Sequence, residues 1–357
     1  MNIYISSAAC ISPQQSFGLA QVPVQPVAHN SNFLKAIEPA YQDILDPKLT
    51  RRMSRIIRMG VATAIECLKE GDVTNPGAIV TGTAYGCLED TGIFLSRLIE
   101  QDEQMLSPTA FIQSTHNTVG AQIALMHKCN EYNNTFVHRG FSFESALLDS
   151  IMLLREGEAK NVLVGGIDEI TDTSFAILNR FGLYKKENIS NLSLFQSTSK
   201  GTIAGEGAAF FLLSSVSSEN NLAQLEGLST FYKPSSNADI VKNIGDFVNE
   251  HALTVNDIDL VITGRNGDEQ NDEVYNYLRE NIFINNEVIN YKHLCGEYPT
   301  AVSFAMWFAA KILHTNGSQQ VMGYNAGKQI KRILIYNNYL GIHHSLILLT
   351  AVNQAAC

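Results

Sequence analysis

The sequence predicts an α/β fold built from two similar halves, each with a sheet covered by helices. One observation is a strand, an elbow and a helix in residues 134–157. Residues 135–137 read as a short buried strand, Arg139-Gly140 as a tight turn, and apolar residues then recur at helical spacing until Gly157. A second observation is that strands and helices alternate again after residue 240. Such alternation implies parallel sheets with helices on their faces.

Length and composition agree with a globular protein of this size. The chain has 357 residues, of which 45% are hydrophobic and 17% charged, so it is long enough for two halves that each bury a core. A formal charge of -10 with no long basic run argues against nucleic acid or an anionic membrane surface as the partner. No apolar run approaches the ~18 residues of a membrane helix, so we expect no membrane insertion.

The cysteines indicate a reducing compartment. The six cysteines show no CxxC pairing, and most lie in apolar segments. This usage is typical of a cytoplasmic protein without a disulfide framework. Zinc is not expected, and we predict neither a metal site nor a cofactor.

The first half begins with a predicted strand at residues 2–10 and a helix after the basic cluster at residues 51–55. Two interpretations of the cluster stay open: its charges are paired internally, or they dock an acidic carrier protein. A buried strand at residues 78–81 and a helix at about 88–99 follow. Residues 117–125 and 174–182 are predicted as short helices, and residues 210–213 as a strand.

The second half repeats this order. Its predicted helices are residues 240–251, 274–278 and 300–313, and its predicted strands are residues 260–263, 333–336 and 345–349. We divide the chain into residues 1–198, which carry the elbow, and residues 199–357. Together they are expected to form one compact unit.

The elbow is a place where chemistry is expected. A strand, turn and helix put the elbow residue beside the helix N-terminus, whose free N–H groups and dipole favour negative charge. This is a good position for a nucleophile. The residue there is Gly140, which has no side chain and cannot attack.

Three further segments complete a pattern around this elbow. They are Asn-Val-Leu-Val-Gly-Gly-Ile-Asp at residues 161–168, Gly-Thr-Ile-Ala-Gly-Glu-Gly-Ala at 201–208, and Tyr-Lys-His-Leu-Cys-Gly-Glu at 291–297. The pattern resembles the β-ketoacyl synthase (ketosynthase) family across nearly the whole chain. The resemblance implies a thiolase-like five-layer αβαβα fold made from a duplicated unit.

The same resemblance implies a site without its catalytic side chains. Ketosynthases need a cysteine thiolate at the elbow and two histidines. These positions correspond to Gly140, to Gly264 at the start of Gly-Arg-Asn-Gly-Asp-Glu-Gln-Asn-Asp, and to Glu297. The lysine of the last motif is kept as Lys292. His343-His344 stands where the family has a glycine-rich turn.

The chain is therefore predicted to be non-catalytic by itself and similar to a chain-length factor, the partner subunit of a ketosynthase. The expected partners are an active ketosynthase in a heterodimer, with a homodimer as fallback, and an acyl carrier protein. The departures resemble the small subunits of aryl polyene or flexirubin pathways. The strand before the elbow is expected to pair across the dimer.

The chain-length factor resemblance also predicts residues that line an acyl tunnel. Leu88, Thr91 and Leu95 share one helix face by their spacing, and residues 107–111 match a loop that reaches across the dimer. The predicted tunnel residues are Tyr85, Leu88, Thr91, Leu95 and Ala110. Ordinary core packing is the alternative for this face.

The elbow also contains a sequence similar to the nucleophile motif of hydrolases. Gly140-Phe-Ser142-Phe-Glu144 begins like the G-x-S-x-G motif of α/β-hydrolases, with Glu144 replacing the last glycine. Hydrolysis by Ser142, or a different thioester activity of a ketosynthase homologue, is therefore the alternative function. His138 and Cys295 are expected to be packed residues rather than relocated catalysts.

Overall fold

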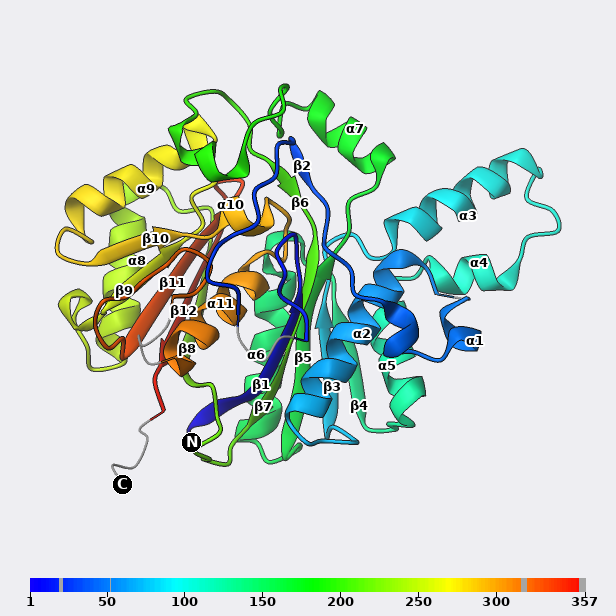
Figure 1. Cartoon of the computed structure of the whole chain (residues 1–357), viewed down its shortest axis with the longest axis horizontal. Coiled ribbons are helices and arrows are strands. Elements are labelled where there is room, and N and C mark those ends of the chain that lie inside the picture. Colours follow the sequence, from blue (N-terminus) through cyan, green and yellow to red (C-terminus); the bar gives the residue numbers. More distant parts are fainter. Residues whose placement is uncertain (19–21, 52, 316–319, 353–357) are drawn as a thin grey trace.

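A computed structural model describes residues 1–357 except 19–21, 52, 316–319 and 353–357. Figure 1 shows one large sheet whose strands form two groups, with helices between the groups and on their outer sides. Helices α6 (Ser142–Arg155) and α11 (Val302–His314) share one apolar core with strands of both groups. Two further cores lie on the outer faces. The predicted five-layer αβαβα fold is therefore confirmed.

The ten strands of the large sheet divide into two groups with the same internal order. In the first group, parallel β4, β3 and β5 are followed by antiparallel β7 and β1. Their bounds are β1 (Ile3–Ile11), β3 (Ala78–Gly82), β4 (Tyr132–Phe136), β5 (Asn161–Asp168) and β7 (Gly207–Ser214).

The second group repeats this pattern strand for strand. Parallel β10, β9 and β11 are followed by antiparallel β12 and β8, so each strand has a counterpart in the first group. Their bounds are β8 (Ala223–Tyr232), β9 (Leu260–Thr263), β10 (Glu287–Asn290), β11 (Arg332–Tyr339) and β12 (His343–Thr350). A short pairing between β1 and β8 joins the groups. The halves are thus similar in topology.

Two details differ from the sequence prediction. Both groups of strands are mixed rather than parallel, and the second half shows why: only residues 340–342 separate β11 from β12, and so short a connection joins antiparallel strands. Strands β8 and β10 were not predicted. In β10 every residue is half-buried, and β8 lacks regular alternation, so neither gives a clear period of two.

The covering helices follow from their apolar patterns. Helices α2 (Arg55–Glu70) and α5 (Thr118–His127) pack on the outer face of the first group, and α8 (Asn237–Glu250) and α9 (Glu269–Asn281) on that of the second. Helix α11 is apolar around nearly its whole circumference, as a central helix must be.

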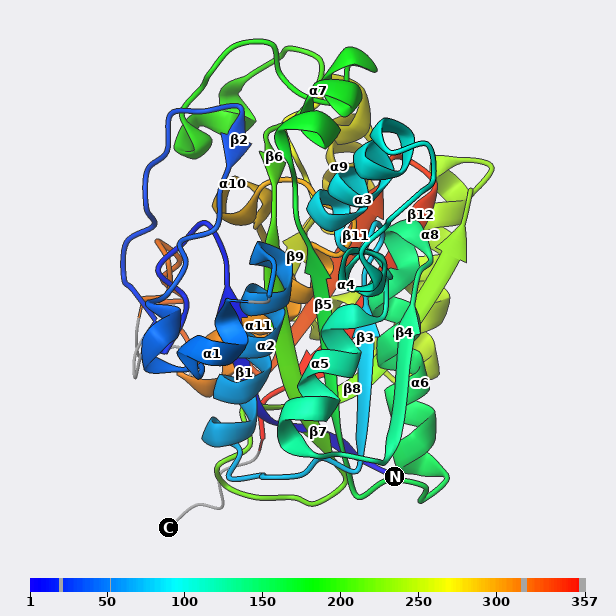
Figure 2. The ribbon, with the colours of Figure 1, turned by 90° about the vertical axis from the view of Figure 1, so that its right-hand side faces the viewer.

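Helices α3 (Leu88–Glu100) and α4 (Pro108–Gln113) extend away from the sheets as an arm (Figure 1). The rings of Phe94 and Phe111 hold the two helices together, with centroids 5.6 Å apart. Asp90 is the buried residue of α3, so this helix is not ordinary core. The arm lies on the same side as β4, the edge strand of the sheet (Figure 2).

Shorter elements complete the described chain. They are α1 (Pro47–Thr50), α7 (Asp172–Arg180), α10 (Lys292–Cys295) and the paired strands β2 (Phe33–Leu34) and β6 (Ala204–Gly205). The boundary at residue 198 stays a prediction. Because β7 follows that point but pairs with β1 and β5, we propose a boundary in residues 215–222. Within the described ranges, no helix is long and apolar enough to cross a membrane.

Candidate functional site

The elbow has the predicted order of a strand, a tight turn and a helix. The prediction of a buried strand at residues 135–137 is wrong, because β4 spans residues 132–136 at the edge of the sheet and is only partly buried, and Val137 is exposed. After β4, a single 3-10 turn (Arg139–Phe141) leads into α6, and Arg139 adopts a left-handed φ of 50°. The Ser142 hydroxyl fixes this turn, because it accepts the His138 N–H at 2.8 Å and donates to the Arg139 carbonyl at 2.8 Å. The backbone of a nucleophile elbow is therefore present without a nucleophile.

The space that a side chain at position 140 needs is filled. A Cβ built on Gly140 would lie 2.7 Å from Cδ1 of Tyr339 and 3.0 Å from Cβ of His343. The Tyr339 ring is held from its other end, where its hydroxyl lies 3.4 Å from that of Tyr85. Tyr339 and His343 thus close the place where the family's cysteine would project.

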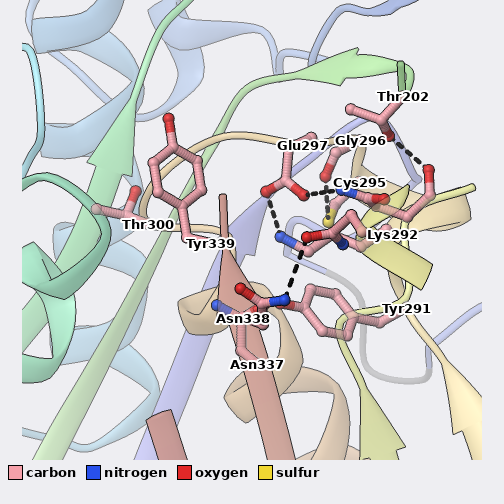
Figure 3. Close-up of polar contacts among 12 residues, drawn as sticks. Thr202, Tyr291, Lys292, Cys295, Gly296, Glu297, Thr300, Asn337, Asn338 and Tyr339 are labelled. Carbon is pink, nitrogen blue, oxygen red and sulfur yellow. Dashed lines mark hydrogen bonds and ion pairs between the residues drawn. The ribbon is translucent and has the colours of Figure 1, made fainter. Parts of the chain in front are cut away.

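Glu297, at the second histidine position, is part of a buried polar network (Figure 3). Lys292 Nζ donates to Glu297 Oε1 at 2.5 Å, and Asn266 Nδ2 donates to Oε2 at 2.8 Å. The Lys292 and Glu297 side chains are only 1% and 7% exposed. Both oxygens of this carboxylate are occupied, so Glu297 is a bound counter-ion rather than a free base.

Gly264, at the first histidine position, is also enclosed. A Cβ there would clash with Oδ1 of Asn337 and lie 2.9 Å from the hydroxyl oxygen of Tyr275. Asn337 in turn accepts a hydrogen bond from the Tyr291 hydroxyl at 2.8 Å. These polar groups occupy the space into which a histidine side chain would extend.

Asp272, the last residue of the segment that begins at Gly264, shapes the loop after Gly264. Its carboxylate accepts the N–H groups of Asn266 at 3.0 Å and Gly267 at 3.1 Å, and it pairs with Arg265 Nε at 2.9 Å. These bonds aim Asn266 toward Glu297. Asp272 therefore supports the network at Glu297.

A cavity of about 590 Å³ opens in front of these positions, and we call it the inner cavity. Glu297, Asn266 and Tyr339 lie at one wall, and Tyr85 and Leu88 belong to the same lining. The structure thus brings two predicted tunnel residues to the degenerate site.

The remaining predicted tunnel residues, Thr91, Leu95 and Ala110, do not line the inner cavity. Leu88, Thr91 and Leu95 line a second cavity of about 770 Å³ between α3 and α7, which we call the α3–α7 groove. Ala110 lies on α4 and lines neither cavity. The tunnel role of all five residues stays a prediction.

Asp168 links the two halves beside the inner cavity, a role that the sequence did not reveal. Its carboxylate accepts the Ala84 N–H and the Thr300 hydroxyl, both at 2.8 Å. Burial raises the pKa of Asp168 to about 6, although these hydrogen bonds oppose the shift. Asp168 therefore positions the turn that carries Tyr85 against the start of α11.

In the basic cluster at residues 51–55, Arg55, the first residue of α2, is paired internally. Two guanidinium nitrogens of Arg55 donate to the carboxylate of Glu206 at 2.7 and 2.6 Å, and Nε contacts Glu38. Glu206 is the fully buried glutamate of the Gly-Glu-Gly-Ala turn. Arg55 therefore holds this turn and is not free to dock an acidic carrier protein.

Two of the alternative catalysts, Ser142 and Cys295, are packed residues. Ser142 is fully buried, and its hydroxyl both donates and accepts within the elbow, which argues against an exposed hydrolase nucleophile. Burial raises the pKa of the Cys295 thiol well above its usual value, so it stays protonated. His138 is exposed, because it directly follows the edge strand, so the prediction that it is packed is wrong. Its Nδ1 lies 3.3 Å from Ser145 Oγ.

His343 and His344 face opposite sides of β12. His343 packs its ring edge-on to Phe141, with ring centroids 4.7 Å apart. His344 contacts the Tyr336 hydroxyl through Nδ1 at 2.9 Å, and burial lowers its pKa to about 4. Both histidines lie in β12, after the turn at residues 340–342, and contribute packed aromatic surface.

The geometry shows that the space at Gly140 is filled, and comparisons with known proteins show a ketosynthase-like fold. The family model for the N-terminal domain of β-ketoacyl synthases matches residues 25–184. This match confirms the predicted resemblance for the first half of the chain, which contains the elbow and residues 161–168. A search of curated proteins gives no match.

Solved structures match over nearly the whole chain. The ishigamide ketosynthase/chain length factor has a TM-score of 0.80 and 15% identity, covering 98% of this chain and 99% of that one. A β-ketoacyl synthase from Burkholderia phymatum STM815 has a TM-score of 0.76 and 14% identity, covering 99% and 100%. A type II polyketide synthase acyl-carrier protein in complex with its ketosynthase (AntDE:AntF) gives 0.73 and 14%, covering 98% and 99%.

Proposed function

We propose that this chain is a non-catalytic, ketosynthase-like chain-length factor that pairs with an active β-ketoacyl-ACP synthase. The observation that carries the proposal is the contact of Tyr339 and His343 with Gly140, which leaves no room for a nucleophile. The proposed setting is cytoplasmic synthesis of a polyketide or aryl polyene-type chain on an acyl carrier protein.

Electrostatics at the second histidine position support the lack of catalysis. Condensation develops negative charge on the thioester oxygen, and a histidine beside it stabilises that charge by donating a hydrogen bond. Here the position holds the Glu297 carboxylate, already bound by Lys292 and Asn266. A carboxylate offers no donor and repels the developing charge, so it opposes the reaction.

The edge of the sheet supports a dimer. Strand β4 pairs with β3 on one side only, which leaves a row of backbone groups on its other side (Figure 2). Large apolar side chains are exposed on β4, just after it and on neighbouring helices: Leu125, Tyr132, Val137, Leu148 and Met152. An active ketosynthase that adds its own edge strand would cover them, and a second copy is the fallback.

The proposed effect on chain length is steric. Tyr85 and Leu88 line the inner cavity, and Thr91 and Leu95 continue from Leu88 along α3. Side chains that limit a cavity also limit the chain that it holds, because overpacking costs about 1–3 kcal/mol. Ala110, on α4 of the same arm, is proposed to act at the dimer contact.

Co-expression with a cysteine-bearing ketosynthase tests the function. We expect the two proteins to co-purify, and we expect malonyl condensation only when both are present. The control is the same ketosynthase with its cysteine replaced, which should bind this chain but show no activity. Condensation by this chain alone would refute the proposal.

A further inference from the structure

A small cavity of about 130 Å³ lies beside helix α9, where strands β9 and β10 end (Figure 1). We call it the arginine pocket, because Arg265 and Arg279 both line it. Thr263 and Asn290 also line it, and they are the last residues of β9 and β10 and neighbours in the parallel register. Open α/β sheets bind ligands at the carboxyl ends of their strands.

Two guanidinium groups line the pocket, and no aspartate or glutamate does among the described residues. Arg265 Nε donates to Asp272 Oδ2 at 2.9 Å, and its guanidinium carbon lies 5.8 Å from the centre of the Phe195 ring. These contacts fix the side chain and leave its two Nη groups for a ligand. Arg279 is exposed in the last turn of α9, and its guanidinium has no hydrogen bond or ion pair with the described part of the chain.

The rest of the lining offers a further donor and an apolar side. The Thr263 hydroxyl donates to Asn290 Oδ1 at 2.6 Å. This bond uses the acceptor of the Asn290 amide and leaves its Nδ2 donor for a ligand. Leu278 and Phe283 are 1% and 2% exposed and line the same cavity. The pocket therefore combines positive charge and N–H donors with an apolar side.

We propose that the arginine pocket binds a small organic carboxylate. Arg265 and Arg279 hold the carboxylate oxygens, because a planar guanidinium group matches a carboxylate through two parallel hydrogen bonds. The short apolar part of the ligand lies on Leu278 and Phe283, which inorganic phosphate would leave uncovered. The cavity is well below the ~300–1,000 Å³ of pockets for drug-sized ligands, so the ligand is small.

Arg265 connects this pocket to the degenerate site. Its partner Asp272 also accepts the Asn266 N–H at 3.0 Å, and Asn266 donates to Glu297 Oε2 at 2.8 Å. A ligand that binds Arg265 in the folded protein therefore stabilises this loop. The temperature of unfolding should rise with the concentration of the ligand.

The inference goes beyond the proposed function. Strands β10 and β4 stand at opposite ends of the sheet order, so a partner that binds at β4 leaves the arginine pocket open. The test uses the purified chain without a ketosynthase. Failure to form a heterodimer would overturn the proposed function alone, and failure to bind a carboxylate would overturn the arginine pocket alone.

The test uses butyrate as the carboxylate and phenylglyoxal as a reagent for accessible arginines. The protein is treated with phenylglyoxal with and without butyrate, and mass spectrometry of peptides measures the modification of each arginine. We expect butyrate to protect Arg265 and Arg279 and to raise the temperature of unfolding. Butyramide, which has nearly the same shape but no charge, should do neither.

Two variants and a matched control locate the binding, with affinity measured by isothermal titration calorimetry. Arg279→Gln should weaken butyrate binding roughly tenfold, because it removes hydrogen bonds to a charged group. Arg279→Lys should bind with intermediate affinity, because it keeps the charge but loses the planar fork. Arg155→Gln is the control: Arg155 is also exposed in the last turn of a helix, α6, but does not line the pocket, so this variant should bind butyrate as wild type does.

Three results would overturn the proposal. If butyrate protects neither arginine, or protects no better than butyramide, the pocket does not recognise a carboxylate. An unchanged affinity in Arg279→Gln would place the binding elsewhere. Tighter binding of inorganic phosphate than of butyrate would mean that the apolar side takes no part in recognition.

Discussion

The ammonium group of Lys292 donates to the carboxylate of Glu297 at 2.5 Å, and both side chains are buried at the degenerate site. Lys292 thus neutralises Glu297, the residue that the sequence resemblance places at the second catalytic histidine position. The Lys292–Glu297 pair has a structural role, and its loss should lower the free energy of unfolding.

Lys292→Met should destabilise the protein by about 3–5 kcal/mol, because Glu297 would be left buried without a cation. The double variant Lys292→Met/Glu297→Leu should recover part of this loss. Urea unfolding measures both. Lys242→Met, which breaks the exposed pair with Asp246 on α8, is the matched control and should leave the midpoint unchanged. Equal midpoints for all variants would contradict a structural role of the buried pair.

Gly140→Ala should destabilise the protein by about 1–3 kcal/mol, because its Cβ meets Tyr339 and His343. Gly245→Ala is the matched control. Position 245 lies inside α8 with no atom within 4 Å of an added Cβ, so alanine there should stabilise by up to about 1 kcal/mol. Thermal or urea unfolding compares the two. Equal effects would mean that the space at the elbow is open.

Gly140→Cys should not restore condensation, because Gly264 and Glu297 still lack the histidine functions. Adding Tyr339→Gly would make room for the thiol and should still give no activity. The measurement is malonyl condensation by the purified variants. Activity from the single change would show that the correspondence of Gly264 and Glu297 with the histidine positions is wrong.

The pH dependence of stability should contain a contribution from Glu144. This side chain is 1% exposed, and burial raises its pKa from 4.5 to about 7, while Ser345 and Lys292 oppose the shift. Between these values the folded protein keeps a proton that the unfolded chain releases. The stabilising contribution is therefore complete below pH 4.5 and is lost as pH rises toward 7.

Glu144→Gln should remove this contribution. The difference in unfolding free energy between wild type and variant, measured from pH 4.5 to pH 7, should shift steadily in favour of the variant as pH rises. Glu280→Gln, at an exposed position near the end of α9, is a control without such a trend. A constant difference across this range would mean that Glu144 titrates normally.

Product length should respond to the residues along α3. In the pair with an active ketosynthase, Leu88→Phe and Thr91→Trp should shorten the product, and Tyr85→Ala should lengthen it. A cost of ~1.4 kcal/mol shifts a product ratio tenfold. Ile284→Phe, at a 69% exposed site away from both cavities, is the control. Chromatography that gives one length distribution for every active variant would exclude this role.

The sequence predicted the fold well where its signals were local. The elbow, the strand at residues 260–263 and the central helix α11 have strong apolar patterns, and the structure has each of them. It failed for β8 and β10, whose partial burial blurs the period of two. Strand direction was also missed, because it depends on which strands pair rather than on the residues of any one strand.

The sequence predicted that the catalytic side chains are missing, but it did not predict which residues fill the space at Gly140. Aligned motifs gave Gly140, Gly264 and Glu297, yet nothing near Gly140 in the chain indicated that Tyr339 would occupy its side-chain volume. That contact arises because the hairpin of β11 and β12 brings the second half of the chain against the elbow. The two partners of Glu297 come from different segments: Lys292 belongs to the same motif, whereas Asn266 belongs to the segment that begins at Gly264, and only the fold brings it to Glu297.

The most direct test of the central claim is native mass spectrometry of this chain with a cysteine-bearing ketosynthase during turnover with acyl- and malonyl-carrier protein. We predict a heterodimer in which the acyl group is attached to the ketosynthase alone and never to this chain. An acyl adduct on this chain during turnover, or two proteins that stay apart, would contradict the account.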